Sequence, residues 1–238
     1  MRDLQMAIKI FADGADLKQM VELYKQFPEI KGLTTNPSLM KKAGITDYMV
    51  FAKKVLTEIP ALPISFEVFA DEADEMIRQA RIIASWGEQV YIKIPITNTK
   101  GDFTGSVIKT LASEGIKLNI TAIFTVEQVK KVVTVLDKNT PAIISVFAGR
   151  IANTGIDPMP IMKACIEVLK AWPKAELLWA SSREALNIIQ AEETGCHIIT
   201  LTPDLIKTKK LFGHDLEKFS LETVQTFYED AVSAGYLL

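Results

Sequence analysis

Apolar residues along the chain fall into short runs that alternate with segments of helical spacing. The runs are rich in β-branched residues and have the length of buried strands. Each is bounded by Gly, Pro, Asn, Asp or charged residues. They predict strands at residues 8–12, 63–69, 90–96, 117–124, 142–148, 177–182 and 197–201, and at residues 32–37 a short strand that runs into a polar turn.

Helical spacing fills most of the intervals between these runs. Leu17, Met20, Val21 and Tyr24 recur on one face, and Pro28 ends that helix. Thr125, with Gln128 three residues later, predicts a capping box. We expect helices at 17–27, 47–59, 71–86, up to about 114, from 125, after 158, at 204–212 and at 221–234.

This alternation predicts the fold class. Strands separated by helices at intervals of roughly 20–35 residues favour parallel βα units, and eight of them favour a closed (β/α)8 barrel, a TIM barrel. An open doubly wound sheet is the alternative, disfavoured because no Gly-x-Gly-x-x-Gly follows the first strand. We expect the barrel at 1–212 and a helical extension at 213–238, packed on its own barrel or on a neighbouring subunit.

Composition narrows the functional classes. The 238 residues are 48% hydrophobic with a net charge of −2, which gives no electrostatic reason to expect nucleic acid or membrane as a partner. Two histidines argue against zinc chemistry, so we expect no metal. Three features predict a soluble cytoplasmic protein. The two cysteines form no motif, Asp3 and Gln5 stand where a signal peptide carries basic residues, and no apolar run reaches membrane-spanning length.

Lys93 is the most informative residue. It lies in the middle of the apolar run at 90–96. Burial disfavours the charged form of an amine, and a neutral lysine can condense with a carbonyl to form a Schiff base. The alternative is a strand lysine whose amine reaches solvent or pairs with a carboxylate.

Further polar residues follow the predicted strands. In a barrel, chemistry gathers at the carboxyl ends of the strands. Each residue alone has an ordinary explanation as a turn, cap or surface residue, but their joint position around one lysine indicates a site. The set is Asp13, Asn36, Glu67, Lys93, Asn119, Thr121, Ser145, Arg150, Ser181 and Arg183.

These residue types suggest roles. Glu67 has an aromatic residue on either side, which favours its protonated form and suits it to pass protons to and from a carbinolamine. Asp13 is a second base. Two arginines and a serine near helix starts, Arg150, Arg183 and Ser181, make a phosphate site. The indicated ligand is a sugar phosphate with a ketone.

Five segments carry a resemblance to a known family. They are Gly-Leu-Thr-Thr-Asn-Pro-Ser-Leu at 32–39, Val-Tyr-Ile-Lys-Ile-Pro at 90–95, and the segments at 118–124, 145–151 and 180–183. The chain resembles the transaldolase family, in the short branch that also contains fructose-6-phosphate aldolase. The resemblance covers nearly all of the predicted barrel.

The resemblance implies a role for each residue. Lys93 is the expected Schiff-base lysine, Asp13 takes the hydroxyl proton as the carbon–carbon bond breaks, and Glu67, Thr121 and a water move protons. Asn36, Asn119 and Ser145 are expected to orient the dihydroxyacetone unit, and Arg150, Ser181 and Arg183 to hold the phosphate. Thr35 and Phe147 are further expected substrate-binding residues.

The resemblance also implies the reaction. A dihydroxyacetone unit passes from fructose 6-phosphate or sedoheptulose 7-phosphate to an aldose phosphate, in the non-oxidative pentose phosphate branch and without a cofactor. Short members often form decamers of two pentameric rings, so a homo-oligomer is expected. A fructose-6-phosphate aldolase and a barrel that binds a sugar phosphate without turnover are the alternatives.

Two positions separate the activities within the branch. The aldolases carry glutamine and tyrosine where this chain has Glu67 and Phe147, so both positions are of the transaldolase type. The chain also departs from the family pattern. Gly14 follows Asp13 where threonine or serine is usual, which makes Asp16 a weaker candidate for the same role, and Asn153 stands where an acid is often found after Arg150.

Overall fold

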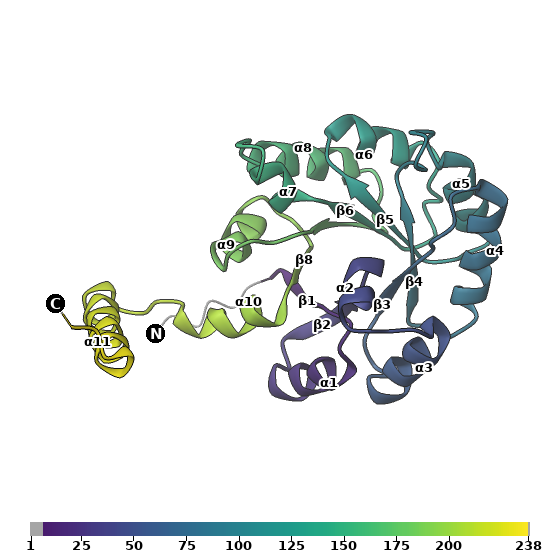
Figure 1. The fold of residues 1–238 in the computed structure, drawn as a ribbon. Helices are drawn as coiled ribbons and strands as arrows, with labels where there is room; N and C mark the ends of the chain where they lie inside the picture. Colours follow the sequence, from purple (N-terminus) through teal and green to yellow (C-terminus); the bar gives the residue numbers. More distant parts are fainter. Residues whose placement is uncertain (1–6, 238) are drawn as a thin grey trace.

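Eight parallel strands close into a barrel in the computed structural model, which describes residues 7–237 (Figure 1). Each strand pairs with its neighbours in sequence, and β1 also pairs with β8 to close the ring. The predicted fold class is therefore confirmed. The strands are β1 Lys9–Asp13, β2 Ile30–Thr34, β3 Ile64–Glu67, β4 Val90–Pro95, β5 Leu118–Ile123, β6 Ala142–Val146, β7 Ala175–Trp179 and β8 Ile198–Leu201.

Helices surround the barrel and cover the outer faces of the strands (Figure 1). Two of them, α2 and α7, follow strands directly at the carboxyl-terminal mouth. The helices are α1 Leu17–Gln26, α2 Pro37–Lys42, α3 Tyr48–Glu58, α4 Ala73–Ala84, α5 Gly105–Ser113, α6 Val126–Val133, α7 Ala148–Ala152, α8 Met159–Leu169, α9 Leu186–Glu193, α10 Pro203–Thr208, the 3-10 turn Lys209–Leu211 and α11 Leu216–Ala234.

Two apolar clusters hold this arrangement. The larger lies between strands and helices and includes Ile92 and Ile120, which have no exposed surface. The smaller is built from strand residues and the residue after β7, and it fills the barrel interior: Phe11, Ile143, Leu178, Ala180 and Ile198. Burial of apolar area is the main contribution to the stability of the fold. Apolar side chains fill the interior of the barrel, and the polar side chains gather at its mouth.

Several predicted boundaries were wrong, for identifiable reasons. The second strand is 30–34 and starts earlier than predicted, and the polar turn predicted after it contains Asn36, which caps α2, and Pro37, the first residue of α2. The sixth ends at Val146 because Ala148 begins α7, and the seventh is 175–179 rather than 177–182. The short helices α2, α7 and α9 were not predicted, since so few residues carry little periodicity. The capping box of Thr125 and Gln128 was confirmed.

The last helix stands apart from the barrel (Figure 1). It starts at Leu216 rather than 221, because Asp215 accepts a hydrogen bond from Lys218 N and caps it. None of its residues is buried, and its exposed apolar side chains include Leu216, Leu221, Val224, Phe227, Tyr228 and Val232. Within residues 7–237 no helix has the length and apolar character needed to cross a membrane. Asp3 and Gln5 lie outside the described residues.

Candidate active site

Lys93 lies in the middle of β4 with its side chain only 8% exposed. Its Nζ donates a hydrogen bond to Thr35 O at 2.9 Å and lies 3.0 Å from Glu67 Oε2. The strand register pairs Glu67 with Lys93 on neighbouring strands, so this contact follows from the sheet itself. The alternative that Lys93 reaches bulk solvent is excluded, whereas pairing with a carboxylate is what the structure shows.

Two acceptors lie next to the Lys93 Nζ. A neutral amine has two N–H groups and one lone pair. Thr35 O and Glu67 Oε2 can engage both N–H groups and leave the lone pair of Lys93 for a carbonyl carbon.

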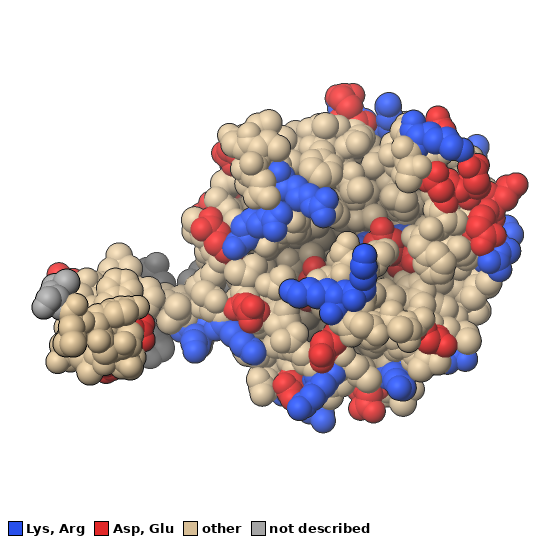
Figure 2. Space-filling view, in the orientation of Figure 1, with Lys and Arg blue, Asp and Glu red and all other residues tan. Residues whose placement is uncertain are grey.

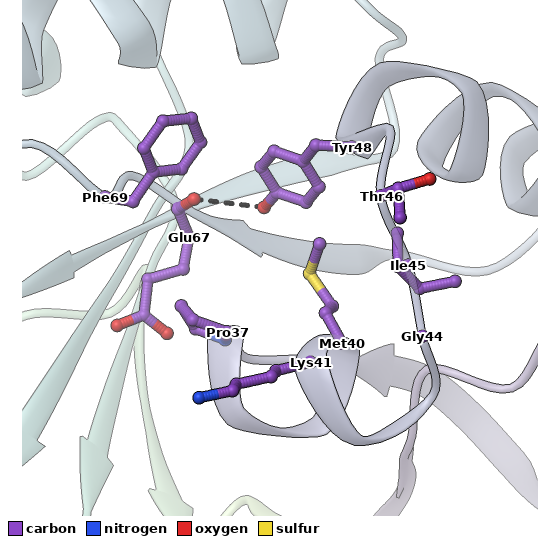
Figure 3. Close-up of a pocket in the computed structure, with 9 residues that line it drawn as sticks. All are labelled: Pro37, Met40, Lys41, Gly44, Ile45, Thr46, Tyr48, Glu67 and Phe69. Atoms are coloured by element: carbon purple, nitrogen blue, oxygen red, sulfur yellow. Dashed lines mark hydrogen bonds between the residues drawn. The ribbon is translucent and has the colours of Figure 1, made fainter.

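Glu67 lies next to a group of packed aromatic side chains. Tyr48 Oη donates a hydrogen bond to Glu67 O at 3.0 Å, and the Tyr48 ring contacts Phe66, Phe69 and Trp86 at centroid distances of 5.5–5.9 Å. Figure 3 shows Tyr48 and Phe69 beside a cavity, about 430 Å³ in volume, with the Glu67 carboxylate directed away from the Tyr48 ring. Burial raises the pKa of Tyr48 well above its usual value, so its hydroxyl stays a donor.

Asp13 ends β1 on the other side of the mouth. Its Oδ1 accepts a hydrogen bond from Thr34 Oγ1 at 2.8 Å, and Thr34 Oγ1 lies 2.6 Å from Thr200 Oγ1. Burial raises the pKa of Asp13, while Lys93 and the bond from Thr34 oppose that rise. A carboxylate of raised basicity in this position is suited to accept a hydroxyl proton.

A chain of buried polar groups crosses the barrel next to Lys93. Asn119 Nδ2 donates to Ser65 Oγ at 2.9 Å, and Ser145 Oγ donates to Asn119 Oδ1 at 2.7 Å. Because Asn119 is paired with Lys93 in the β4–β5 register, this chain fixes the amide beside the amine. Buried polar groups that satisfy each other keep their orientation, which suits Asn119 to position a ligand.

Thr121 lines both cavities at the mouth of the barrel. Its Oγ1 is buried and has no hydrogen-bond partner among the described residues. The next residue, Ala122, has a φ of 59°, and the pairing of β5 with β6 shifts register between Ile120 and Ile123. A non-glycine residue in the left-handed region costs about 1 kcal/mol or more and is common at functional sites. The Thr121 hydroxyl is therefore available to a water or a substrate.

Two adjoining cavities, of about 100 and 460 Å³, occupy the mouth. Figure 2 shows this hollow at the centre of the barrel face, with Lys and Arg side chains at its rim over α2 and α7. Within residues 7–237 no group of three His, Cys, Asp or Glu side chains is placed to hold a metal ion. The side chains that line both cavities are those of Asp13, Asn36, Lys93, Thr121, Phe147 and Arg150.

The cationic side of the mouth is formed where α7 meets the end of β7. The Arg150 guanidinium lies over the Phe147 ring at 5.1 Å, and Ser181 lines the smaller cavity. With the Asn153 amide turned to suit its neighbours, its oxygen accepts a hydrogen bond from Arg183 Nη2 at 3.0 Å. Asn153 can therefore orient Arg183 without cancelling its charge, as an acid at that position would.

Gly149 permits this close approach. A Cβ at Gly149 would lie 1.6 Å from Ser181 O and 3.2 Å from Arg183 Cγ. Ser181 itself has a φ of 64°, so the segment that carries Ser181 and Arg183 is bent sharply toward α7.

Not every predicted residue contributes a side chain to the cavities. Thr35 contributes its main-chain oxygen to Lys93, while its hydroxyl is buried without a partner among the described residues. Asn36 lines both cavities and also caps α2 by accepting a hydrogen bond from Leu39 N. Arg183 lies beside α7 and is not among the residues that line the two cavities.

Sequence reasoning missed residues that hold the predicted ones. Thr34, Thr200, Ser65 and Tyr48 make hydrogen bonds to Asp13, Thr34, Asn119 and Glu67 respectively. Threonine and serine within an apolar run are a signal that could have found the first three. Nothing in the sequence around Tyr48 indicates that its hydroxyl reaches β3.

Comparisons with known proteins match this chain to one family over nearly its whole length. The family model described as Transaldolase/Fructose-6-phosphate aldolase matches residues 10–236. A probable transaldolase 2 of Listeria monocytogenes is 34% identical over 219 residues, which cover 90% of this chain and 93% of that protein. A probable transaldolase of Herpetosiphon aurantiacus is 32% identical over 229 residues, covering 96% and 98%.

Solved structures with little sequence identity share the fold alone. The 3-hexulose-6-phosphate synthase of Salmonella typhimurium matches with a TM-score of 0.57 at 14% identity, covering 82% of this chain and 89% of that one. A putative phosphonomutase of Burkholderia cenocepacia matches with a TM-score of 0.59 at 10% identity, covering 99% and 96%.

Proposed function

This chain belongs to the transaldolase/fructose-6-phosphate aldolase family, and on that premise we propose that it is a transaldolase. The proposed reaction transfers a dihydroxyacetone unit from a ketose phosphate, fructose 6-phosphate or sedoheptulose 7-phosphate, to an aldose phosphate. Its proposed place is the non-oxidative pentose phosphate pathway.

One observation carries the proposal. A lysine whose side chain is 8% exposed lies at the mouth of the barrel, 3.0 Å from a carboxylate, and lines the same cavities as a second carboxylate, that of Asp13. A stability role alone does not explain a buried ammonium at the end of a barrel where catalytic groups gather.

The proposed reaction begins with attack of the Lys93 lone pair on the ketone carbon. Two of the three protons of the Lys93 ammonium pass to the carbonyl oxygen, which leaves as water, and the iminium that forms keeps the third. Glu67, 3.0 Å from Nζ, is placed to take the amine proton and to return it to the departing oxygen. The unpaired Thr121 hydroxyl supports a water in this proton transfer.

Cleavage then needs a base at the far side of the iminium. Asp13 takes the proton of the hydroxyl on the carbon beyond the bond that breaks, an aldose phosphate leaves, and the bonding electrons pass into the iminium to give an enamine on Lys93. Addition to a second aldehyde reverses these steps, with Asp13 returning the proton to the new hydroxyl, and water releases the product. The raised pKa of Asp13 supports both directions of transfer.

The phosphate of either aldose is assigned to the cationic side of the mouth. Arg150 lines both cavities, Ser181 lines the smaller one, and Arg183 lies beside Gly149. Guanidinium groups bind phosphate through paired hydrogen bonds, which suits a site that must hold two different aldose phosphates in turn.

Release of free dihydroxyacetone, the aldolase outcome, is disfavoured by Phe147. A tyrosine hydroxyl at this position could donate a proton to the enamine, whereas phenylalanine cannot. An acceptor-dependence assay tests the choice. We expect cleavage of fructose 6-phosphate to require erythrose 4-phosphate, whereas equal turnover without an acceptor would identify an aldolase. Absence of turnover with every donor and acceptor pair would favour a barrel that only binds sugar phosphates.

We also propose that the chain forms a homo-oligomer through α11. This helix exposes Leu221, Val224, Phe227 and Tyr228 and has no buried residue on its own barrel. Exposed apolar patches of this kind mark interaction sites, and a second copy is the proposed occupant, in a decamer of two pentameric rings. Sedimentation of the full chain and of a chain ending at residue 212 tests this: an unchanged oligomeric state after truncation would contradict it.

Cys165 and Cys196 are buried free thiols, and burial raises the pKa of each to about 12. Thiols that stay reduced are typical of a reducing compartment, and we propose a cytoplasmic location. Fractionation of the native host followed by immunodetection tests it, and recovery outside the cytoplasm would contradict it.

A further inference from the structure

Three neighbouring strands meet where the barrel closes, and each contributes one polar side chain at that seam. Asp13 ends β1, Thr34 ends β2 beside it in register, and Thr200 lies on β8. In the β1–β8 register Thr200 pairs with Phe11, two residues before Asp13, so it lies one step deeper in the barrel. Thr34 and Thr200 are both buried, at 4% and 6% exposure.

The number of protons fixes the direction of the hydrogen bonds. Thr34 has one hydroxyl proton, and it is donated to the Asp13 carboxylate, which can only accept. The bond of 2.6 Å between Thr34 and Thr200 must then be donated by Thr200. The chain therefore runs in one direction, from Thr200 through Thr34 to Asp13.

We propose that Thr200 is a positioning residue that acts through Thr34 to hold the Asp13 carboxylate in the orientation and charge state needed to take the substrate hydroxyl proton. This inference rests on the proposed transaldolase reaction and gives Thr200, which lines the smaller cavity beside Thr34, a role that is exerted through Thr34. A hydroxyl that accepts a hydrogen bond becomes a stronger donor, so Thr200 strengthens the bond from Thr34 to Asp13.

Several charged groups lie near Asp13 and influence its carboxylate together with the hydrogen-bond chain. Lys93 and Glu67 interact with it across the barrel, with opposite signs, and Arg150 lines the same cavity. On the outer side, Asp16, Lys42 and Asp204 share another cavity with it. None of these groups changes when Thr200 is substituted, so a change at Asp13 reports the hydrogen-bond chain.

Carboxyl-carbon NMR of aspartate-labelled protein tests the proposal without requiring activity. The Asp13 signal is the one missing from Asp13→Asn, and its pKa is followed in each variant. Thr34→Val removes a bond to a charged group and should raise the Asp13 pKa by about one unit. Thr200→Val should raise it by roughly a few tenths of a unit, because the remaining bond is weakened rather than lost.

Two controls separate this role from general packing. Thr200→Ser keeps the hydroxyl and should restore the wild-type pKa. Thr140→Val removes a buried threonine that bonds to Ala112 O and lies before β6, and it should leave Asp13 unchanged. Thr200→Ala, which introduces no additional methyl group, replaces Thr200→Val if that variant does not fold.

The pH dependence of the activity then tests whether the hydrogen-bond chain affects the reaction. The acidic limb of kcat/KM should move to higher pH in Thr200→Val by the same amount as the NMR pKa, and return in Thr200→Ser. An Asp13 pKa that stays at the wild-type value in Thr200→Val and in Thr200→Ala would overturn the proposed role of Thr200. A wild-type protein without turnover would instead overturn the proposed function, while the NMR result would still decide the hydrogen-bond chain.

Discussion

Tyr48, on α3, donates a hydrogen bond to the main-chain oxygen of Glu67 at 3.0 Å. Glu67 is the last residue of β3, where regular pairing ends, and its carboxylate lies 3.0 Å from Lys93 Nζ. A helix outside the barrel therefore fixes the main chain of a residue whose side chain faces the inside (Figure 3). Groups held in this way keep the geometry that proton transfer requires.

Tyr48→Phe keeps the aromatic contacts and removes this one bond. We expect the free energy of unfolding to fall by about 1 kcal/mol and kcat to fall severalfold, with KM nearly unchanged, since Glu67 is assigned to the chemical steps. Urea unfolding and steady-state kinetics measure both. Tyr24→Phe, on α1, is the matched control, and a kcat equal to that of wild type in Tyr48→Phe would show that the bond does not position Glu67.

Gly149→Ala should be costly, because an added Cβ would lie 1.6 Å from Ser181 O, a main-chain atom that cannot move alone. The expected loss of stability is about 3 kcal/mol, with KM for phosphorylated donors raised as Ser181 and Arg183 shift. Gly87→Ala is the control, since its Cβ would approach nothing closer than 3.8 Å. Equal stability of the two variants would contradict the described packing of α7.

Arg183→Ala and Arg150→Ala should weaken phosphate binding. Loss of a charge-assisted contact predicts a KM for fructose 6-phosphate raised about tenfold or more, with little change when unphosphorylated dihydroxyacetone is the donor. Lys18→Ala, an exposed cation on α1, should change neither value. An equal rise for both donors would remove the phosphate role from these arginines.

Asp13 should cost the protein stability at neutral pH. Its pKa is raised by burial, so the folded state binds the proton more tightly than the unfolded state. The stability that this provides is complete below the ordinary pKa of 3.8 and is lost as the pH rises through the folded-state value. Asp13→Asn should therefore be more stable than wild type at pH 7 while losing turnover, and thermal unfolding from pH 5 to 8 measures the difference.

Asp71 is a control of opposite sign. Hydrogen bonds from Thr99 N and Oγ1 lower the pKa of Asp71, so its contribution is present at neutral pH and is lost as the pH falls. Asp71→Asn should then be less stable at pH 7. If Asp13→Asn and Asp71→Asn shift stability in the same direction, the assigned environments are wrong.

The sequence predicts the barrel well because its signal is long-range and repeated. A buried strand such as that of Ile92 and Ile94 shows itself by an apolar run, whatever it pairs with. The candidate catalytic residues could also be predicted from the sequence, because a charged lysine is unusual within an apolar strand. The carboxyl ends of all eight strands meet at the same mouth of the barrel. Many of the predicted side chains therefore line one cavity.

What the sequence did not predict depends on contacts between distant segments. The bond from Tyr48 to Glu67 and that between Thr34 and Thr200 join residues 19 and 166 positions apart. The close approach of Gly149, on the short helix α7, to Ser181 O is another such contact, and no local pattern predicts it. The predicted end of β6 was late because the apolar residues Phe147 and Ala148 continue the run into α7, and that of β7 was late because Ala180 continues the run beyond Trp179.

The central claim concerns the Lys93 amine and is tested by trapping its adduct. The protein is incubated with fructose 6-phosphate and borohydride, and the peptides are mapped by mass. We expect one reduced dihydroxyacetone adduct, on Lys93, and none in Lys93→Ala, whose fold is checked by circular dichroism. A wild-type protein that cleaves the donor yet carries no adduct on Lys93, or carries it on another lysine, would contradict the account.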